Sequence, residues 1–93
     1  MLINFKDDDF IDKIKKEEMS VIQFSASWCA PCKVLKPIME KLSDEFKEKI
    51  NFYYADIDDG AINTASSMSV RGVPTVVIFK KGQEVSRKVG SVP

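Results

Sequence analysis

The most informative segment of the chain is Val21-Ile22-Gln23-Phe24-Ser25-Ala26-Ser27-Trp28-Cys29-Ala30-Pro31-Cys32-Lys33. Its first part, up to Ser27, is nearly continuous in strand-forming residues, which indicates a strand buried on both faces of a sheet. Apolar residues then recur at steps of three and four from Val34 to Phe46, a spacing that predicts an amphipathic helix. Both cysteines therefore lie where a buried strand gives way to a helix.

Strand patterns and helix patterns alternate along the rest of the chain. Residues 2–5 have the apolar character of a short edge strand, and a helix is predicted from about Asp8 to Glu17. Asp7-Asp8-Asp9 offers this helix an N-cap and an acidic first turn. The later patterns predict a strand over 50–57, a helix over 61–68, a strand over 75–79 and, after a tight turn at Lys81-Gly82, a strand over 84–89.

The resulting order of elements, β-α-β-α-β-α-β-β, indicates the α/β class. Strands that alternate with helices imply parallel pairing, and the closing hairpin adds antiparallel strands. We therefore expect a central mixed β-sheet flanked by helices. The chain has 93 residues, which suits a single domain over residues 1–93 with one small core.

The composition argues against several classes of protein. Lys and Arg number 14 and Asp and Glu number 14, a balance that gives no support for a nucleic-acid binder with a basic face. No apolar run approaches the roughly 20 residues that span a bilayer, and residues 1–9 lack the features of a signal peptide. We therefore expect a cytoplasmic protein without nucleic-acid or membrane partners.

The chain contains two cysteines and no histidine, which narrows its chemistry further. A His-dependent zinc site, a Ser-His or Cys-His nucleophile pair and a disulfide-stapled secreted scaffold are all excluded. The sequence has no Gly-rich loop for a phosphate or nicotinamide group, so we predict no bound cofactor and no metal.

Cys29 and Cys32 lie at the junction between the strand and the helix. The end of the strand places Cys29 at the carboxyl edge of the sheet, where the unpaired N–H groups of a helix start favour a thiolate. The thiolate is the nucleophilic form of cysteine. Cys32 lies about one turn further along and is expected to be more buried. Pro31 is compatible with a first helical turn, where its missing N–H has no acceptor.

Three interpretations of the cysteine pair are open on spacing alone. The pair can cycle between dithiol and disulfide, it can be half of a four-ligand zinc site completed by another chain, or it can be two inert buried thiols. Trp28 and Pro31, which bracket the first cysteine at the junction of two elements, favour the redox interpretation.

Four segments carry a resemblance to a known family. They are Trp28-Cys29-Ala30-Pro31-Cys32-Lys33 with Pro37 beyond it, Asp56-Ile57-Asp58, Arg71-Gly72-Val73-Pro74-Thr75, and Lys80-Lys81-Gly82. In order and spacing these segments resemble the active-site signature, the cis-proline loop and the accompanying motifs of thioredoxins. The resemblance covers essentially the whole chain. It implies a thioredoxin-like fold and a lowered pKa for the active-site thiol.

The resemblance also implies roles for individual residues. Cys29 attacks a disulfide in a partner protein, and Cys32 then resolves the mixed disulfide. Pro74 follows a cis peptide bond and faces the cysteines, and the Val73 backbone pairs with an extended substrate segment. The residues implied for the apolar rim that receives partners are Trp28, Pro31, Ile57, Val73, Pro74 and Gly90. Ordinary core packing is the alternative for Ile57 and Val73, and a trans proline that begins a strand is the alternative for Pro74.

The sequence departs from the thioredoxin pattern at two positions near the site. Ala30 stands where the family usually has glycine, and we expect a small change in redox poise. Gln23 stands where the family often has a buried aspartate that takes the proton of the resolving cysteine, and Tyr54 replaces the lysine that often accompanies it. Because an amide cannot accept a proton, we expect Cys32 to be deprotonated less efficiently.

The C-terminal region is a third departure. Thioredoxins usually continue past Gly90 into a final helix that covers one face of the sheet, whereas this sequence stops at Pro93. We therefore expect part of that face to be uncovered, the stability to be lower, and a monomer with a capacity for weak self-association through this face.

The leading prediction is an enzyme, a thiol–disulfide oxidoreductase of reducing type. It would reduce disulfides in partner proteins and, as the resemblance implies, receive electrons from a separate thioredoxin reductase. A cytoplasmic setting, where dithiols stay reduced, supports this direction. The alternatives are a disulfide oxidase or isomerase, and a non-catalytic module that uses the same surface to hold a partner.

Overall fold

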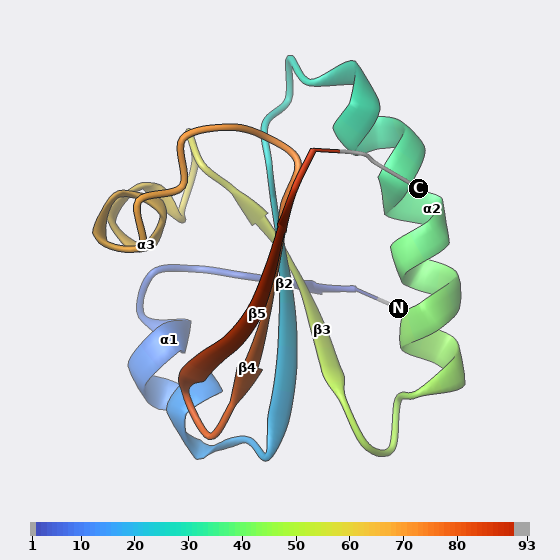
Figure 1. The fold of residues 1–93 in the computed structure, drawn as a ribbon, viewed down its shortest axis with the longest axis vertical. Helices are drawn as coiled ribbons and strands as arrows, with labels where there is room; N and C mark the ends of the chain where they lie inside the picture. Colours follow the sequence, from blue (N-terminus) through green and yellow to red (C-terminus); the bar gives the residue numbers. More distant parts are fainter. Residues whose placement is uncertain (1, 91–93) are drawn as a thin grey trace.

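Residues 2–90, which the computed structural model describes, form a five-stranded β-sheet with helices on both faces (Figure 1). The strands lie in the order β1-β3-β2-β4-β5, with the bounds β1 Ile3–Asn4, β2 Met19–Ser25, β3 Asn51–Asp56, β4 Thr75–Lys80 and β5 Gln83–Val89. β3 pairs in parallel with both β1 and β2. β4 runs antiparallel to β2 and to β5. The predicted mixed sheet is therefore confirmed, and its antiparallel part is the closing hairpin.

β2 is the central strand, as the continuous apolar character of its sequence indicates. Six of its seven residues are buried. Hydrogen bonds to β3 on one side and β4 on the other pair its backbone groups, as burial requires. β2 begins at Met19 and ends at Ser25, which is two residues earlier at each end than the predicted strand. The chain therefore leaves the sheet at its carboxyl edge just before the cysteine segment.

Each face of the sheet is covered by its own helical layer (Figure 1). α2 (Ala30–Glu45) lies on one face, over a small core cluster of Val21, Met39 and Phe52. On the other face lie α1 (Asp9–Asp12), the 3₁₀ turn η1 (Ile14–Lys16) and α3 (Ile62–Ser67). The larger core cluster lies beneath this second layer. None of the helices within residues 2–90 is long and apolar enough to cross a bilayer.

The first helix is shorter than the predicted helix from Asp8 to Glu17. α1 ends at Asp12, Lys13 leaves the helical conformation with a φ of −124°, and the chain continues as the turn η1. The tighter 3₁₀ turn buries Ile14 in the core before the chain enters β2. The prediction of one continuous helix was wrong because apolar spacing does not distinguish a helix from two short turns that bury the same residues.

Asp7 caps a helix that is distant from it in sequence. The predicted acidic first turn of α1 is confirmed by Asp9, but the predicted capping is not, since Asp8 at the N-cap makes no capping hydrogen bond with its side chain. Asp7 instead accepts hydrogen bonds from the backbone N–H groups of Thr64 (2.8 Å) and Asn63 (3.2 Å) in α3. No residue at the N-cap of α3 provides this contact. Asp7 therefore joins the start of the chain to α3.

Replacement of Asp7 by alanine is expected to lower the free energy of unfolding by about 1 kcal/mol at neutral pH. Burial works against ionisation of Asp7, but hydrogen bonds from Thr64 and Asn63 outweigh it and hold the pKa of the carboxyl below its ordinary value. Because the pKa is lowered by folding, this stabilisation is present above the unfolded-state pKa of about 3.9 and is lost as the pH falls through the folded-state value. Urea unfolding of the wild type and Asp7→Ala at neutral and strongly acidic pH measures the effect. A difference that is equally large in acid contradicts it.

β4 and β5 are joined by a tight turn at Lys81 and Gly82. Both residues have positive φ angles, 51° and 83°, as a two-residue type I′ hairpin turn requires. A Cβ atom at Gly82 would lie 2.9 Å from the Cα of Lys15 in η1, so the turn also packs closely on the first part of the chain. The predicted turn is confirmed.

The α2 side of the sheet is covered unevenly. Val76 and Ile78 of β4 are only half-buried on this side, and α2 exposes Ile38 (54%) and Leu42 (36%). Among residues 2–90, no second helix lies beside α2 over this part of the sheet (Figure 1). We call Ile38, Leu42, Val76 and Ile78 the uncovered face. Residues 91–93, on which the prediction about the chain end partly depends, lie outside the described residues.

Candidate active site

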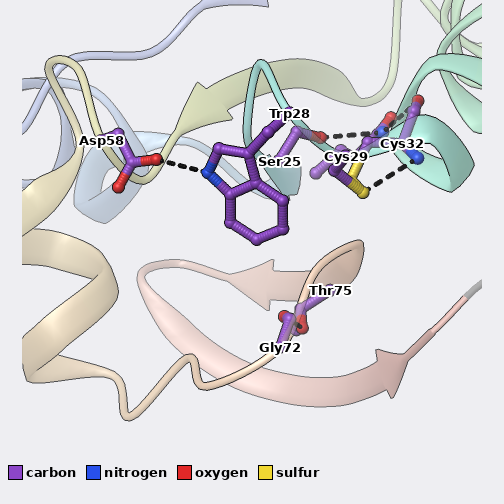
Figure 2. The surroundings of a disulfide bond; sticks show 8 residues. Ser25, Trp28, Cys29, Cys32, Asp58, Gly72 and Thr75 are labelled. Carbon is purple, nitrogen blue, oxygen red and sulfur yellow. Dashed lines mark hydrogen bonds between the residues drawn. A yellow bond between two sulfur atoms is a disulfide. The ribbon is translucent and has the colours of Figure 1, made fainter.

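Cys29 and Cys32 form a disulfide bond at the start of α2 (Figure 2). Their Cα atoms are 5.3 Å apart. Cys29 is the N-cap residue of α2, and its sulfur accepts a hydrogen bond of 3.2 Å from the backbone N–H of Cys32. Cys29 is 4% exposed and Cys32 is fully buried. The structure thus agrees with the predicted position of the pair and with the deeper burial of Cys32.

The local sequence explains how the pair is presented. Ala30 and Pro31 are the first two residues of α2. Pro31 has no N–H, and at this position a helix has no acceptor for one. Ala30 does not have a positive φ, so alanine replaces the family's usual glycine without strain, as expected. A strand that ends at Ser25 and a helix that begins at Ala30 therefore fix Cys29 between them.

A loop from much later in the chain lies against the cysteines. The peptide bond between Val73 and Pro74 is cis, as the resemblance implies, and it lies between α3 and β4. Val73 and Ile57, both half-buried, pack against the small buried cluster that contains the two cysteines. The N–H of Gly90 donates to the carbonyl of Pro74 at 2.7 Å. The structure therefore brings Val73 and Ile57 to the edge of the cysteine site, and Gly90 is joined to the same loop through Pro74.

Trp28 provides the most exposed part of the expected rim. Its side chain is 68% exposed, and its Nε1 donates a hydrogen bond of 2.8 Å to Asp58 (Figure 2). Pro31 is also exposed, whereas Pro74 is fully buried. The expectation that Pro74 adds apolar surface to the rim is therefore wrong, because its ring is taken up by packing at the start of β4. The exposed apolar surface comes from Trp28 and Pro31.

Gln23 is fully buried on β2 beneath the cysteine pair. Its Nε2 donates to the hydroxyl of Ser25 at 3.0 Å and to the backbone carbonyl of Cys32 at 3.2 Å. Tyr54 lies opposite Gln23 on β3, and the ammonium group of Lys36 lies over the Tyr54 ring, 4.5 Å from its centre. A neutral amide in contact with Cys32 therefore occupies the position predicted to lie under the site.

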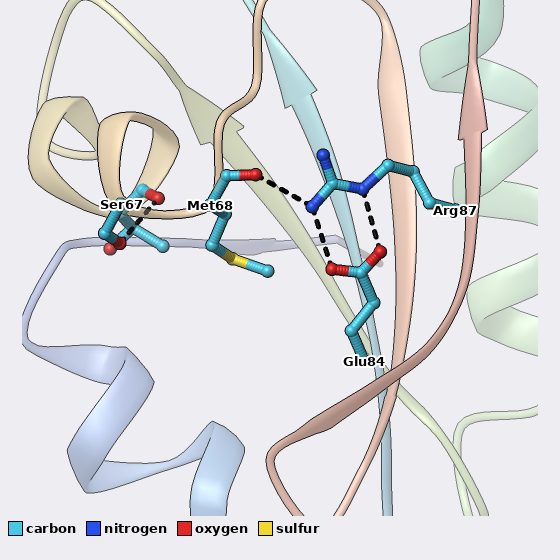
Figure 3. A network of polar contacts seen from close by, with 5 residues as sticks. Ser67, Met68, Glu84 and Arg87 are labelled. Carbon is cyan, nitrogen blue, oxygen red and sulfur yellow. Dashed lines mark hydrogen bonds and ion pairs between the residues drawn. The ribbon is translucent and has the colours of Figure 1, made fainter.

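Arg87 anchors the start of the loop that carries Pro74 (Figure 3). Its Nε and Nη2 each donate to a carboxylate oxygen of Glu84 at 2.8 Å, and Nη2 also donates to the carbonyl of Met68 at 2.9 Å. These hydrogen bonds to the Glu84 carboxylate raise the pKa of the Arg87 guanidinium above its ordinary value. Met68 is the C-cap of α3, so this contact joins β5 to the point where the loop begins.

Ser25, Asp58 and Arg87 support the site, although the sequence patterns assign them no role. Ser25 lies two residues after Gln23, so the alternation of a strand places both side chains on one face. Asp58 belongs to a segment that carries the family resemblance. Arg87 has no such signal, because only tertiary packing brings it to Met68. Within residues 2–90, no three His, Cys, Asp or Glu side chains are grouped so that they could hold a metal ion.

A disulfide formed by closely spaced cysteines at a helix N-terminus, next to a cis-proline loop, defines a thiol–disulfide exchange protein. The family model for thioredoxin matches residues 1–93. The chain therefore belongs to the thioredoxin family. It is a thiol–disulfide oxidoreductase, and the corresponding enzyme activity is protein-disulfide reduction.

Individual relatives agree with this assignment. Thioredoxin M4, chloroplastic, of Arabidopsis thaliana is 36% identical over 97% of this chain, which spans 47% of the plant protein. Thioredoxin-1 of Saccharomyces cerevisiae is 35% identical over 100% of this chain and 89% of the yeast protein. The crystal structure of oxidised mitochondrial thioredoxin 3 from the same yeast superposes with a TM-score of 0.88 at 29% identity, over 98% of this chain and 85% of that one.

Proposed function

We propose that this protein uses Cys29 as the nucleophile and Cys32 as the resolving thiol to reduce disulfides in partner proteins. The observation that carries the assignment is the hydrogen bond from the Cys32 N–H to the Cys29 sulfur at the N-terminus of α2. That N–H group and the positive end of the helix dipole both stabilise a thiolate on Cys29 once the disulfide is reduced. Cys32 is fully buried, so it is poorly placed to meet a partner first.

The reaction consists of two thiol–disulfide exchanges. In the first, the Cys29 thiolate attacks one sulfur of the partner disulfide, a mixed disulfide forms, and the other partner sulfur leaves as a thiolate. In the second, Cys32 loses its proton and attacks the Cys29 sulfur, which closes the Cys29–Cys32 disulfide and releases the second partner thiol. Two electrons have then passed to the partner. A thioredoxin reductase is the proposed donor that restores the dithiol.

Partner proteins are proposed to dock on the surface around Trp28 and Pro31. Val73 and Ile57 contribute the half-buried floor of this surface beside the cysteines. The backbone of Val73 would pair with an extended segment of the partner, in the manner of a strand added to a sheet edge. Gly90 supports this arrangement through its hydrogen bond to Pro74.

We further propose that residues 1–93 act as one domain in a reducing compartment such as the cytoplasm, where dithiols persist. One similar protein is named chloroplastic and another is mitochondrial. We therefore propose that the compartment is reducing, and the cytoplasm is one example of such a compartment. The protein is proposed to be a monomer that self-associates weakly through the uncovered face. A sedimentation coefficient that does not change with concentration contradicts the self-association.

The proposed reduction of partner disulfides is tested by catalysed reduction of insulin, with dithiothreitol as the electron source. The wild type is expected to accelerate the precipitation of the insulin B chain well above the rate with dithiothreitol alone. A pure binding module gives no acceleration. An equilibrium with glutathione then separates a reductant from an oxidase or isomerase, because a reductant remains in the disulfide form in buffers that reduce the latter two.

A further inference from the structure

One buried polar atom near the active site has no hydrogen-bond partner. Of the buried side-chain nitrogen and oxygen atoms in residues 2–90, only Oε1 of Gln23 is in this position. Gln23 is 0% exposed, so bulk water does not reach its amide. Buried polar atoms are nearly always paired, and an unpaired one makes the state that contains it less stable.

The orientation of the Gln23 amide follows from its neighbours. Nε2 has two N–H groups, and both are used, one to the Ser25 hydroxyl at 3.0 Å and one to the Cys32 carbonyl at 3.2 Å. The Cys32 carbonyl can only accept a hydrogen bond. Turning the amide over would place two carbonyl oxygens against each other, which is repulsive. Oε1 is therefore the atom left over, on a side chain that contacts the resolving cysteine.

The missing donor is a group that the disulfide form cannot offer. In that form the sulfur of Cys32 carries no proton, because it is bonded to Cys29. Reduction adds two electrons and two protons, breaks the sulfur–sulfur bond and leaves a thiol on each cysteine. Cys29 ionises readily at the helix N-terminus, whereas Cys32 is fully buried and keeps its proton. Reduction thus creates a buried S–H donor on Cys32, the residue whose backbone carbonyl Gln23 already contacts, while Oε1 of Gln23 is a buried acceptor without a partner.

We propose that Oε1 of Gln23 accepts a hydrogen bond from the Cys32 thiol in the dithiol form and thereby helps to set the reduction potential. The inference rests on the redox cycle proposed above. Gln23 is unsatisfied in the disulfide form and satisfied in the dithiol form, so it favours the dithiol and makes the potential less negative. The hydrogen bonds of Nε2 to Ser25 and Cys32 do not involve a sulfur and contribute about equally to both forms.

The test is the thiol–disulfide equilibrium with glutathione for the wild type and Gln23→Met. Methionine has a similar length and no amide, so the variant lacks Oε1. The disulfide form then has no unpaired oxygen at this position, and the dithiol form has no acceptor for the Cys32 thiol. We expect the equilibrium constant to shift roughly tenfold toward the disulfide, which corresponds to a potential about 30 mV more negative. An equilibrium constant that does not change shows that Oε1 is equally satisfied in both forms, for example by an internal water, and overturns the proposal.

Tyr54→Phe is the matched control. Tyr54 is the neighbour of Gln23 on β3 and carries a hydroxyl, so the variant removes the other polar group from the same row of the sheet. We expect its equilibrium with glutathione to match that of the wild type. If instead Tyr54→Phe shifts the equilibrium as far as Gln23→Met does, the hydroxyl of Tyr54 is the partner of Oε1 and the proposal is overturned.

Infrared spectroscopy of the reduced wild type provides a readout that does not depend on the folding of a variant. The S–H stretching band of Cys32 is expected at lower frequency than that of a thiol without an acceptor, and Cys29→Ser assigns the band to Cys32. A band at the frequency of a free thiol overturns the proposal. These measurements involve no partner protein. If insulin is not reduced but the equilibrium and the band behave as expected, only the proposed function fails.

Discussion

Cys29→Ser is expected to abolish catalysed disulfide reduction. Serine keeps the shape of the side chain, but its hydroxyl does not ionise near neutral pH and cannot form a mixed disulfide. In the insulin assay the variant should give the same rate as dithiothreitol alone. Because Cys29 lies at the N-cap of α2, where serine is also a favourable residue, the fold should be retained apart from the loss of the disulfide.

Cys32→Ser is the matched comparison, since it also removes the disulfide but leaves the nucleophile. This variant should react once with a disulfide substrate and then stop at the mixed disulfide, which can be isolated by gel electrophoresis without reductant. The two variants together separate the roles of the cysteines. Residual catalysis by Cys29→Ser, or a stable mixed disulfide on Cys32 rather than Cys29, contradicts the assigned roles.

Gln23→Asp is expected to accelerate the second exchange, in which Cys32 attacks the mixed disulfide. The amide of Gln23 contacts the backbone of Cys32 but cannot take a proton, whereas a carboxylate in this position can act as a general base. Such a base contributes typically about 10²-fold to 10⁴-fold. Because burial raises the pKa of a carboxyl, the acceleration should grow with pH as the new group ionises. The rate is measured by rapid mixing of the reduced protein with a chromophoric disulfide.

Gln23→Asn is the control for the shorter side chain, because it has the shape of the aspartate variant without its charge. We expect it to resolve the mixed disulfide no faster than the wild type. The aspartate variant should also be less stable at neutral pH, since position 23 is fully buried and its neighbour on β3, Tyr54, carries no positive charge. Equal resolution rates in the aspartate and asparagine variants would falsify the base hypothesis.

The sequence predicted the order of the elements because each has a local cause. The continuous run of strand-forming residues in β2 and the three-and-four spacing in α2 are visible within a few turns of chain, and the sequence Lys81-Gly82 suits a turn with two positive φ angles. Element boundaries were less accurate. The predicted first helix is longer than the observed one, because Ile14 enters the core through a 3₁₀ turn that has the same apolar spacing as a helix.

Contacts between distant segments were not predictable in the same way. Asp7 was assigned to the helix that follows it, but it caps α3, and Arg87 reaches Met68 across the loop that carries Pro74. Asp7 has a plausible local role in the sequence, whereas Arg87 has none. The stronger partner becomes available only once the sheet has brought α3 next to the first residues and next to β5.

The amino-acid sequence by itself determined the chemistry. Two cysteines with two residues between them, at the end of a buried strand and the start of a helix, form a redox pair because local geometry brings their sulfurs together. Tertiary structure decided what surrounds the pair. The cis-proline loop, Ile57 and the buried amide of Gln23 come to the site from three separate segments of the chain. Their positions depend on strand order and packing. The unpaired Oε1 of Gln23, the single such oxygen among the buried side chains of residues 2–90, results from that packing and could not be predicted from any local sequence pattern.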